Sequence, residues 1–437
     1  VNLAAIGPSL WMIYTAMSRL IYSTLFYLLL PIILLRLLYR GLKSSGYMSR
    51  WAERFGFVAT TAPKESIWLH AVSVGETLAA VPLVKTLQEK HPDHRLIVTC
   101  MTPTGSERIK AAFGDSVDHC YAPYDMPDSV ARFLNRIKPQ LLIIMETELW
   151  PNTIAACHKR KIPVLLANGR LSEKSANAYR KIQPLIKPML AQLSTVAAQH
   201  SDDGARFVDL GLAENALTVT GNIKFDLSLD QAVRGKAQQL LSEWRGVSER
   251  PILLAASTHR GEDEIILEAF AQIKTRIENL LLVLVPRHPE RFNQVAELCA
   301  SAGFNLARRS SADNVEGADI LLGDTMGELM TFFGACDIAF VGGSLVPSGG
   351  HNVIEPAAWG VPILTGPQLF NFTEASQLLL NGDAMLVCND ANQLAEQCIA
   401  LLNSQQRREQ VGGQARLIAE ANRGALDKLI AVIDRFI

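Results

Sequence analysis

The chain has 437 residues, more than a single hydrophobic core usually supports, so its length favours two domains. Hydrophobic residues make up 49% of it and charged residues 19%, and the net charge of −1 gives no indication of nucleic-acid binding. The seven cysteines include no C-x-x-C pair, so buried free thiols are expected rather than disulfides or a zinc site.

The N-terminal region is the most apolar part of the chain. Residues 20–35, "LIYSTLFYLLLPIILL", carry no charge and are followed by a group of basic residues: Arg36, Arg40, Lys43, Arg50 and Arg54. We expect one membrane anchor over residues 15–45, which either spans the bilayer or lies in its interface. The basic residues predict that the main body stays cytoplasmic, and four of them could attract acidic headgroups or acceptor phosphates: Arg36, Arg40, Lys43 and Arg50. The alternative is a buried amphipathic helix.

From residue 66 onward, short apolar runs alternate with amphipathic stretches. Runs typical of buried strands occupy 66–72, 95–101, 141–146, 163–169 and 194–199, and helical patterns lie between them. The alternation pauses near 220–230 and resumes with runs at 251–257, 280–287, 319–324, 337–343, 361–366 and 384–388, before a helical stretch to residue 437.

This alternation predicts an α/β protein with two Rossmann-like domains, each built on a parallel, doubly wound sheet. We place the domains at 46–225 and 226–437, and the helical C-terminal end of the second could pack back on the first. Ligands of such sheets bind beyond the carboxyl ends of the strands, so the motifs below are expected to converge on a cleft between the domains.

The glycine-rich segment 341–367, "VGGSLVPSGGHNVIEPAAWGVPILTGP", is the most informative in the second half. A strand leads into one glycine pair, a loop carries another, and residues 351–360 have the pattern of a short helix. Backbone N–H groups before a helix favour an anion, so this turn is a candidate phosphate cradle, although it lacks Walker spacing. Glu355 could accept hydrogen bonds from ribose hydroxyls. The alternative is an ordinary glycine-rich turn with Glu355 as a helix-stabilising acid.

Two further strand ends in the second half carry candidate ligand contacts. In "LVPRHPERF", Arg287 is placed to bind phosphate or contact a base, although it could equally be a surface arginine. In "GDTMGELM", backbone groups of residues 326–328 could hold a ligand. The alternative there is a simple helix start capped by Asp324 or Thr325.

Acidic residues follow two strands of the first half. Glu76 in "HAVSVGET" and Glu146 in "METELWPN" each come directly after an apolar run and are expected to share one rim of the sheet. A general base beside a second, positioning acid suits such a pair. We also expect the start of the helix to lower the pKa of Glu76 and keep it ionised. Lys224 could meet a developing negative charge, whereas Glu148 could simply decorate the first turn of a helix.

Compact metal-binding patterns such as D-x-D and H-E-x-x-H are missing from the sequence. If the protein is a transferase, we therefore expect it to stabilise a leaving phosphate with backbone dipoles and basic side chains rather than with a divalent ion.

Taken together and in order, these motifs resemble the Kdo (3-deoxy-D-manno-octulosonic acid) transferases of lipopolysaccharide assembly. The resemblance rests on "HAVSVGETLAAVPLVK", "CMTPTGSER", "METELWPN", "HKRKIPV", "VPRHPERF", "GDTMGELM" and "VGGSLVPSGGHNVIEP", and it covers nearly the whole chain. One departure is "GNIKFD", where relatives could carry another residue before the Ile-Lys pair, although the lysine itself is retained.

The resemblance implies a GT-B glycosyltransferase at the cytoplasmic face of the bacterial inner membrane, with a single N-terminal anchor and no metal or other cofactor. It would transfer Kdo from CMP-Kdo to a lipid A precursor, namely lipid IVA, with membrane lipid as a further partner. Glu76 would be the general base, and Glu146 and Lys224 would stabilise the transition state. The residues expected to bind CMP are Pro286, Arg287, Met326, Gly327, Glu328, Asn352, Val353, Ile354 and Glu355.

Two other functions remain open from the residues alone. One is a nucleotide-sugar epimerase of the same fold, which would need no anchor and would act on a soluble sugar. The other is a non-catalytic, membrane-anchored scaffold that keeps a nucleotide pocket, against which the presence of Glu76, Glu146 and Lys224 argues.

Overall fold

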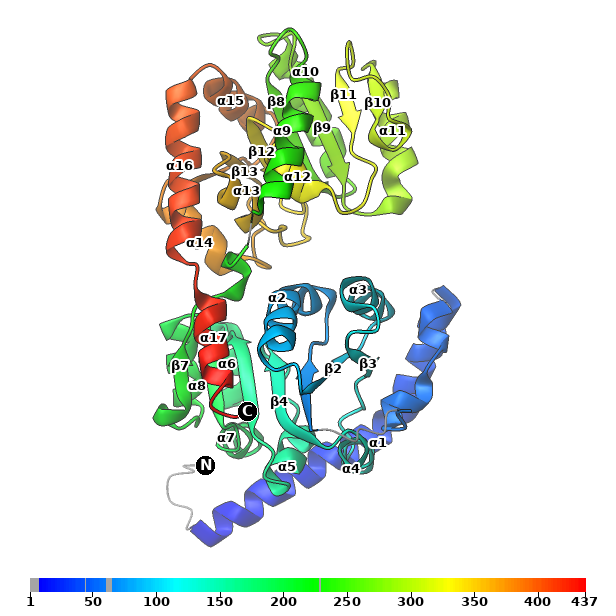
Figure 1. Cartoon of the computed structure of the whole chain (residues 1–437), viewed down its shortest axis with the longest axis vertical. Helices are drawn as coiled ribbons and strands as arrows, with labels where there is room; N and C mark the ends of the chain where they lie inside the picture. Colours follow the sequence, from blue (N-terminus) through cyan, green and yellow to red (C-terminus); the bar gives the residue numbers. More distant parts are fainter. Residues whose placement is uncertain (1–7, 44, 60–64, 228) are drawn as a thin grey trace. The chain divides into compact units, whose positions relative to one another are not determined.

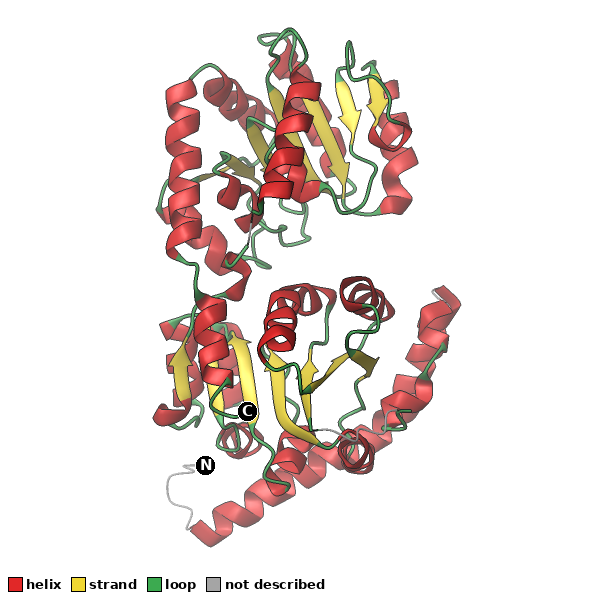
Figure 2. Ribbon diagram, viewed as in Figure 1, coloured by secondary structure: helices red, strands yellow, loops and turns green. Residues whose placement is uncertain are grey.

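The computed structural model describes residues 8–43, 45–59, 65–227 and 229–437. The chain divides into two compact units. Unit 1 comprises Val1–Asp226 together with the C-terminal segment Arg423–Ile437, and unit 2 comprises Leu227–Asn422. Each unit contains its own seven-stranded parallel sheet with helices on both faces (Figure 1, Figure 2).

The sheet of unit 1 has the strand order β3-β2-β1-β4-β5-β6-β7. Its strands are β1 (Ser66–His70), β2 (Arg95–Cys100), β3 (Asp118–Tyr121), β4 (Pro139–Met145), β5 (Val164–Gly169), β6 (Thr195–Ala198) and β7 (Leu217–Val219). The chain runs outward from β1 to β3 and then returns to place β4 beside β1. The point where the order reverses therefore lies between β1 and β4, which is where ligands bind in doubly wound sheets.

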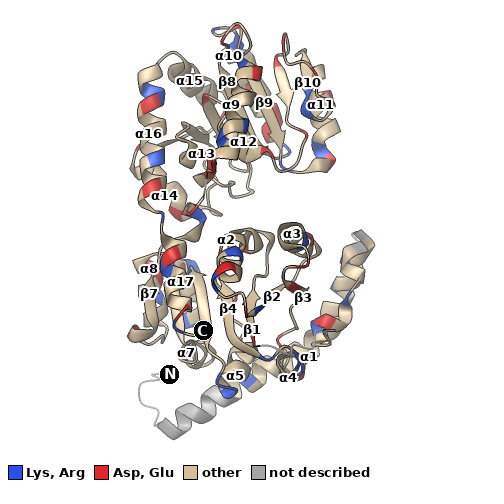
Figure 3. Cartoon of the chain, viewed as in Figure 1, with Lys and Arg blue, Asp and Glu red and all other residues tan. Residues whose placement is uncertain are grey.

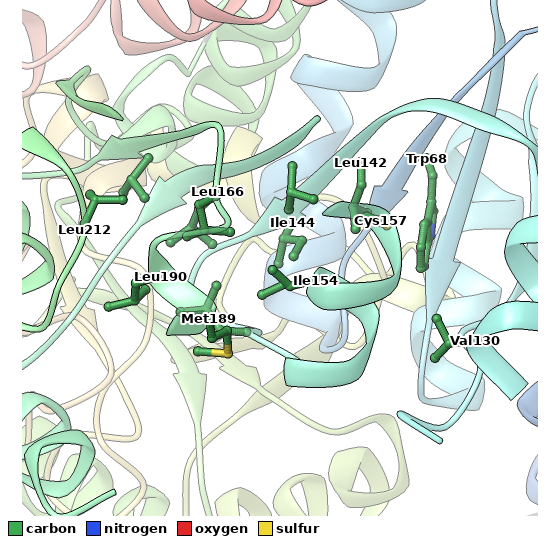
Figure 4. Close-up of a cluster of buried hydrophobic side chains, with 14 of the residues drawn as sticks. Trp68, Val130, Leu142, Ile144, Ile154, Cys157, Leu166, Met189, Leu190 and Leu212 are labelled. Atoms are coloured by element: carbon green, nitrogen blue, oxygen red, sulfur yellow. The ribbon is translucent and has the colours of Figure 1, made fainter. Parts of the chain in front are cut away.

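Helices cover both faces of this sheet. The helices of unit 1 are α1 (Pro8–Lys43), α2 (Val74–Lys90), α3 (Pro103–Phe113), α4 (Pro127–Ile137), α5 (Pro151–Lys159), α6 (Glu173–Arg180), α7 (Gln183–Leu190), α8 (Ser201–Asp209) and α17 (Ala425–Ile433), with short 3₁₀ turns at Ser45–Met48, Trp51–Phe55, Glu214–Ala216 and Ile223–Phe225. One buried cluster joins the sheet to α4, α5, α7 and α8, and Figure 4 shows part of it around Trp68, Ile144 and Leu166. The opposite face packs against α2, α3 and the C-terminal α17.

The C-terminal helix α17 belongs to unit 1 although it follows all of unit 2 in the sequence. Its start is held by Asp226, whose carboxylate accepts the backbone N–H groups of Gly424 at 2.5 Å and Leu426 at 2.6 Å. Leu429 and Ile433 are fully buried in the same cluster as Ile223 and Ala425. The chain therefore crosses twice between the units, at residues 226–227 and 422–423.

The sheet of unit 2 has the order β10-β11-β9-β8-β12-β13-β14. Its strands are β8 (Ile252–Thr258), β9 (Leu281–Pro286), β10 (Leu306–Arg308), β11 (Ile320–Leu322), β12 (Ile338–Val341), β13 (Ile363–Thr365) and β14 (Met385–Val387). Its helices are α9 (Gln231–Arg245), α10 (Glu262–Lys274), α11 (Phe292–Ser301), α12 (Leu329–Phe333), α13 (Ile354–Trp359), α14 (Thr373–Asn381), α15 (Ala391–Leu402) and α16 (Gln405–Ala421), with 3₁₀ turns at Pro289–Arg291 and Arg309–Ser311. The reversal of strand order lies between β8 and β12.

The predicted fold class is confirmed, and every strand expected from the sequence is present. The sequence did not reveal β3, β7 and β10, each of which lies at an edge of its sheet. Edge strands are short and half solvated, so they lack the continuous apolar runs that mark the central parallel strands.

Helix α1 includes the predicted anchor and contains Pro31. Its segment Met17–Leu42 has a mean hydropathy of 2.0 and is the only candidate membrane span among the described residues. Only 11% of its most apolar window is buried, which disfavours the buried-helix alternative. Figure 1 shows α1 running along one end of unit 1, past α5 and α4.

The basic residues after the apolar run do not form one surface group. Arg36 and Arg40 are exposed, and the side chain of Lys43 lies outside the described residues. Arg50 instead turns inward, where its guanidinium pairs with Glu53 at 2.8 Å and donates to Ser106 Oγ at 3.0 Å. Arg54 is 2% exposed and stacks on Tyr121. The prediction that Arg50 attracts headgroups is therefore wrong, because its guanidinium is already paired with groups of unit 1 itself.

Candidate active site

Glu76 lies in the first turn of α2, just beyond the carboxyl end of β1, and is 7% exposed. Ser73 caps the helix, since its hydroxyl oxygen accepts the Glu76 N–H at 3.2 Å. The Glu76 carboxylate accepts the Ser73 hydroxyl at 2.6 Å and the Val72 N–H at 2.7 Å. This reciprocal bonding resembles a capping box and holds the acid in one orientation at the switch point of the sheet.

The pKa of Glu76 differs in direction from the prediction. Burial raises the pKa of its carboxyl from 4.5 to about 6, and the nearby charges of Glu148 and Glu146 also raise it. The hydrogen bonds from Ser73 and Val72 lower the pKa but do not offset the burial. The expected lowering by the helix start is therefore wrong, because desolvation dominates. A carboxyl with a pKa of about 6 is still mainly ionised at neutral pH and is a stronger base than an ordinary glutamate.

Glu146 and Lys224 form an ion pair in the same unit, with 2.6 Å between Lys224 Nζ and Glu146 Oε1. Glu146 directly follows β4, the neighbour of β1, and its backbone has a φ of 55°. Left-handed backbone is uncommon for a residue other than glycine, and it occurs preferentially at functional sites. The predicted rim acids thus lie after adjacent strands, and Lys224 joins them through Glu146.

Asn168 is a residue that the sequence reasoning missed. It lies in β5, is fully buried and also has a positive φ of 54°. Its side-chain oxygen accepts the N–H of Ile223 at 3.1 Å, one residue before Lys224. Asn168 therefore positions the turn that carries the lysine. The sequence signal was the asparagine-glycine pair that ends the run "PVLLANG".

In unit 2, the predicted CMP-binding residues all lie beyond or near the carboxyl ends of strands. Pro286 ends β9 and is buried, whereas the next residue, Arg287, is exposed and its backbone N–H donates to Thr258 O. Met326 is 52% exposed and Gly327 has a φ of 87°, in the turn before α12. Glu328 pairs with Arg309 at 2.9 Å.

Helix α12 begins later than the sequence indicated, at Leu329. Asp324 does not cap it. Its carboxylate instead accepts the Ser310 N–H at 2.7 Å and pairs with Arg308 at 2.7 Å. The turn 326–328 is therefore held by side chains of the preceding segment.

The backbone N–H groups of the glycine-rich turn after β12 have a different partner from the predicted phosphate. The N–H groups of Gly343, Ser344 and Leu345 donate to the carboxylate of Glu262 at 2.7, 2.9 and 2.8 Å. The N–H of His259 also donates to it, at 2.9 Å, and Glu262 is fully buried. The expectation that these N–H groups hold a phosphate is therefore wrong for the first glycine pair, because an acid of the chain itself fills that cradle.

The second part of the motif keeps its candidate ligand groups. Asn352 donates to Glu355 Oε1 at 3.0 Å and accepts the Ile354 N–H at 3.0 Å. Val353 and Ile354 are buried, and burial raises the pKa of the Glu355 carboxyl. Helix α13 ends at Trp359 and is capped by Gly360, close to the end that the sequence predicted. Asn352 thus orders Glu355 at the start of the helix.

Two histidines that the sequence reasoning did not select meet beside this turn. The rings of His259 and His351 stack with centroids 5.0 Å apart, and their Nε2 atoms are 2.7 Å apart. Burial and the charge of Arg287 lower the pKa of His351 to about 3, so its ring is neutral at physiological pH. His259 directly follows β8 and His351 directly follows the glycine pair 349–350, which was the available signal in the sequence.

The described residues contain no cluster of three or more His, Cys, Asp or Glu side chains that could hold a metal ion. All seven cysteines are free, and six of them are buried. Burial raises the pKa of the buried thiols, for example that of Cys100 to about 11, so these groups stay protonated. The predicted free thiols are thus confirmed.

Two Rossmann-like units with these strand orders define a protein of the GT-B fold class. Solved structures with this fold include UDP-GlcNAc 2-epimerase from Neisseria meningitidis, with a TM-score of 0.57 and 13% identity over 85% of this chain and all of that one. A glycosyltransferase from Rickettsia africae has a TM-score of 0.56 and 14% identity, over 86% of this chain and 99% of that one. These likenesses establish the fold alone.

Sequence comparison identifies the family. Residues 49–227 match the family model described as 3-deoxy-D-manno-octulosonic-acid transferase. The chain is 45% identical to the 3-deoxy-D-manno-octulosonic acid transferase of Haemophilus influenzae, over 96% of this chain and 99% of that protein. It is 35% identical to the enzyme of the same name from Bordetella pertussis, again over 96% and 99%. The chain therefore belongs to the Kdo transferase family, as its motifs predicted.

Proposed function

We propose that this protein transfers Kdo from CMP-Kdo to a lipid A precursor, lipid IVA, without a metal ion, and that Glu76 is the general base. The observation that carries this assignment is the environment of Glu76. Its carboxyl is buried at the switch point of unit 1, held by two hydrogen bonds, and has a pKa of about 6. General bases work best when their pKa lies near the operating pH.

In the proposed reaction, an acceptor hydroxyl attacks the anomeric carbon of Kdo. The new bond joins the acceptor oxygen to that carbon, while the bond from the carbon to the phosphate oxygen breaks and CMP leaves with the electron pair. Glu76 takes the proton of the acceptor hydroxyl. Lys224, oriented by its ion pair with Glu146, offsets negative charge that develops during the transfer.

For the donor, we assign CMP binding to the strand ends of unit 2. Arg287 is exposed directly after β9, so its guanidinium is available for the phosphate of CMP. Glu355, ordered by Asn352, is suited to accept hydrogen bonds from the ribose. The turn formed by Met326, Gly327 and Glu328 offers backbone groups to the cytosine base of CMP. These assignments concern unit 2 alone.

We further place the protein at the cytoplasmic face of the bacterial inner membrane. Support comes from the apolar segment Met17–Leu42, which is mainly exposed, and from Arg36 and Arg40, which follow its most apolar part and are exposed as well. A lipid-linked acceptor would be presented at the same surface.

The direct test incubates the purified full chain with CMP-Kdo and lipid IVA and measures the mass of the lipid product. A mass increase corresponding to one or more Kdo units supports the proposal and also counts them. The same protein is offered a soluble nucleotide sugar without lipid. Conversion of that sugar with no change in the lipid would contradict the transferase and favour an epimerase. Binding of CMP-Kdo without either reaction would favour a non-catalytic scaffold.

A further inference from the structure

Helix α1 is tied to unit 1 along one of its faces. Ser18 donates to Pro184 O at 3.0 Å near the start of α7, and Asn152 of α5 donates to Ser23 Oγ at 3.0 Å. Farther along, the Tyr27 hydroxyl donates to Asp128 of α4. These contacts hold the first described turns of the apolar segment against the water-facing domain.

The other face of the same segment is apolar and uncovered. Its exposed large side chains include Leu20, Ile21, Leu25, Leu28, Leu29, Ile32, Leu35 and Leu38. Leu20 and Leu28 are 65% and 68% exposed, which is unusual for leucines in an aqueous domain. A helix that is bonded to a soluble domain on one side and apolar on the other is suited to lie in a membrane interface.

A groove of about 890 Å³ lies between α1, α4 and α5. Three cationic side chains line it, namely Arg19 of α1 and the consecutive Lys159 and Arg160 at the end of α5. Figure 3 marks basic positions in blue on α5, close to α1. Ser23, Tyr27 and Asn152 add hydrogen-bonding groups to the lining, and Leu20 from the apolar face of α1 also borders it.

The positive charge of this groove is not neutralised by carboxylates. None of the three cations takes part in a salt bridge among the described residues, whereas the neighbouring Asp128 pairs with Arg132 at 2.9 Å. The guanidinium of Arg160 donates to the neutral oxygens of Ala156 and Asn135, at 3.3 and 3.2 Å, which hold it without cancelling its charge. The nearby Asp125 is buried and accepts the N–H groups of Asn152 and Thr153.

We propose that this groove binds the phosphate headgroup of an anionic glycerophospholipid, with the acyl chains of that lipid lying along the exposed apolar face of α1. The proposal rests on the membrane association given under the proposed function. The groove supplies cations for the phosphate and an apolar wall at Leu20 that continues onto α1. A soluble phosphate would leave that apolar face uncovered, so the lipid is the occupant that matches both features.

The test measures binding of the full chain to phosphatidylcholine vesicles and to the same vesicles containing phosphatidylglycerol. The groove variant replaces all three cations, as Arg19→Gln, Lys159→Gln and Arg160→Gln. Its matched control removes three exposed cations of α6 and the residue after it, as Lys174→Gln, Arg180→Gln and Lys181→Gln. We expect wild type to favour the anionic vesicles, and the groove variant to lose roughly a hundredfold of that binding. The loss of binding to the anionic vesicles should be less than about a tenth as large in the control variant as in the groove variant.

A second variant, Ala131→Trp, fills the groove without changing charge and should also weaken binding to the anionic vesicles. Binding to phosphatidylcholine vesicles, which depends on α1, should stay unchanged in every variant. Equal losses in the groove and control variants, or full binding by Ala131→Trp, would overturn the proposal in favour of diffuse charge attraction. Glycerophosphate that competes as well as the vesicles would overturn it in favour of a soluble anion. If the wild-type protein bound neither kind of vesicle, that result would instead contradict the membrane association given under the proposed function.

Discussion

The first strand of each unit is followed by a glycine-glutamate pair at the start of a helix, yet the two acids have different surroundings. Glu76 in unit 1 accepts one hydroxyl and one backbone N–H, whereas Glu262 in unit 2 accepts four backbone N–H groups. Both side chains are buried. The same local pattern thus places a buried acid near the start of a helix in both units, but a different number of donors reaches each acid.

Glu262 has its carboxylate oxygens occupied by a turn that it holds together, so we assign it a structural role. Gly342 illustrates how close this packing is, since a Cβ there would lie 2.7 Å from the carbonyl oxygen of Ser257. Glu76 has fewer donors, lies near two other acids, and has a raised pKa. These surroundings are the basis for proposing Glu76, and not Glu262, as the general base.

The largest expected effect concerns catalysis by Glu76. We expect Glu76→Gln to reduce Kdo transfer by about a thousandfold, because the amide cannot accept the proton of the acceptor hydroxyl. CMP-Kdo binding should be retained, since the assigned donor residues all lie in unit 2. Turnover with the lipid acceptor and equilibrium binding of CMP-Kdo measure the two quantities. Glu107→Gln, an exposed acid of α3, is the control, and turnover of the Glu76 variant within a few-fold of that control would refute the base assignment.

The sequence predicts those features of the site that depend on neighbouring residues, and it misses those that depend on residues distant in the chain. Glu76 and Glu146 could be found because each lies at or shortly after the end of an apolar run, and their proximity follows from the parallel sheet. The pKa of Glu76 could not be predicted in direction, because it depends on burial by residues distant in the sequence. The role of Glu262 was missed for a similar reason, since three of its four N–H partners lie 81 to 83 residues later in the sequence. Arg50 looked like a headgroup ligand until its partner Ser106 was known.

The second effect concerns stability and should single out Glu262. We expect Glu262→Ala to destabilise unit 2 by about 3 kcal/mol or more, because four N–H groups, two of them in fully buried hydrogen bonds, lose their acceptor. Calorimetric unfolding of the full chain should show the transition of unit 2 at lower temperature and that of unit 1 unchanged. CMP affinity should fall with it, since the loop from Gly343 to Leu345 is no longer held. An unchanged unfolding profile would mean that the four N–H groups find other acceptors and that Glu262 does not organise this turn.

Glu76→Gln should change stability in the opposite direction. The folded-state pKa of about 6 lies above the ordinary value of 4.5, so folding favours the neutral carboxyl. The favourable contribution of Glu76 is therefore complete below pH 4.5 and is lost as the pH rises through 6. At neutral pH and above, the neutral amide should be more stable than the wild type by up to about 2 kcal/mol. Denaturant unfolding of both proteins across this pH range measures the gap, and a gap that is constant with pH would contradict the burial argument.

The smallest effect is expected from Ser73→Ala, which alters the surroundings of Glu76 without removing the acid. Loss of the helix cap should cost about 1 kcal/mol of stability. The hydrogen bond from Ser73 lowers the pKa of Glu76, so its removal should raise that pKa above about 6. The acidic limb of the pH–rate profile should then move to higher pH, while the rate on the plateau changes little. If Ser73 caps the helix but does not influence Glu76, the Ser73→Ala variant should lose stability while its pH–rate profile stays unchanged. That outcome would make the Ser73–Glu76 contact as purely structural as the one that Glu262 makes in unit 2.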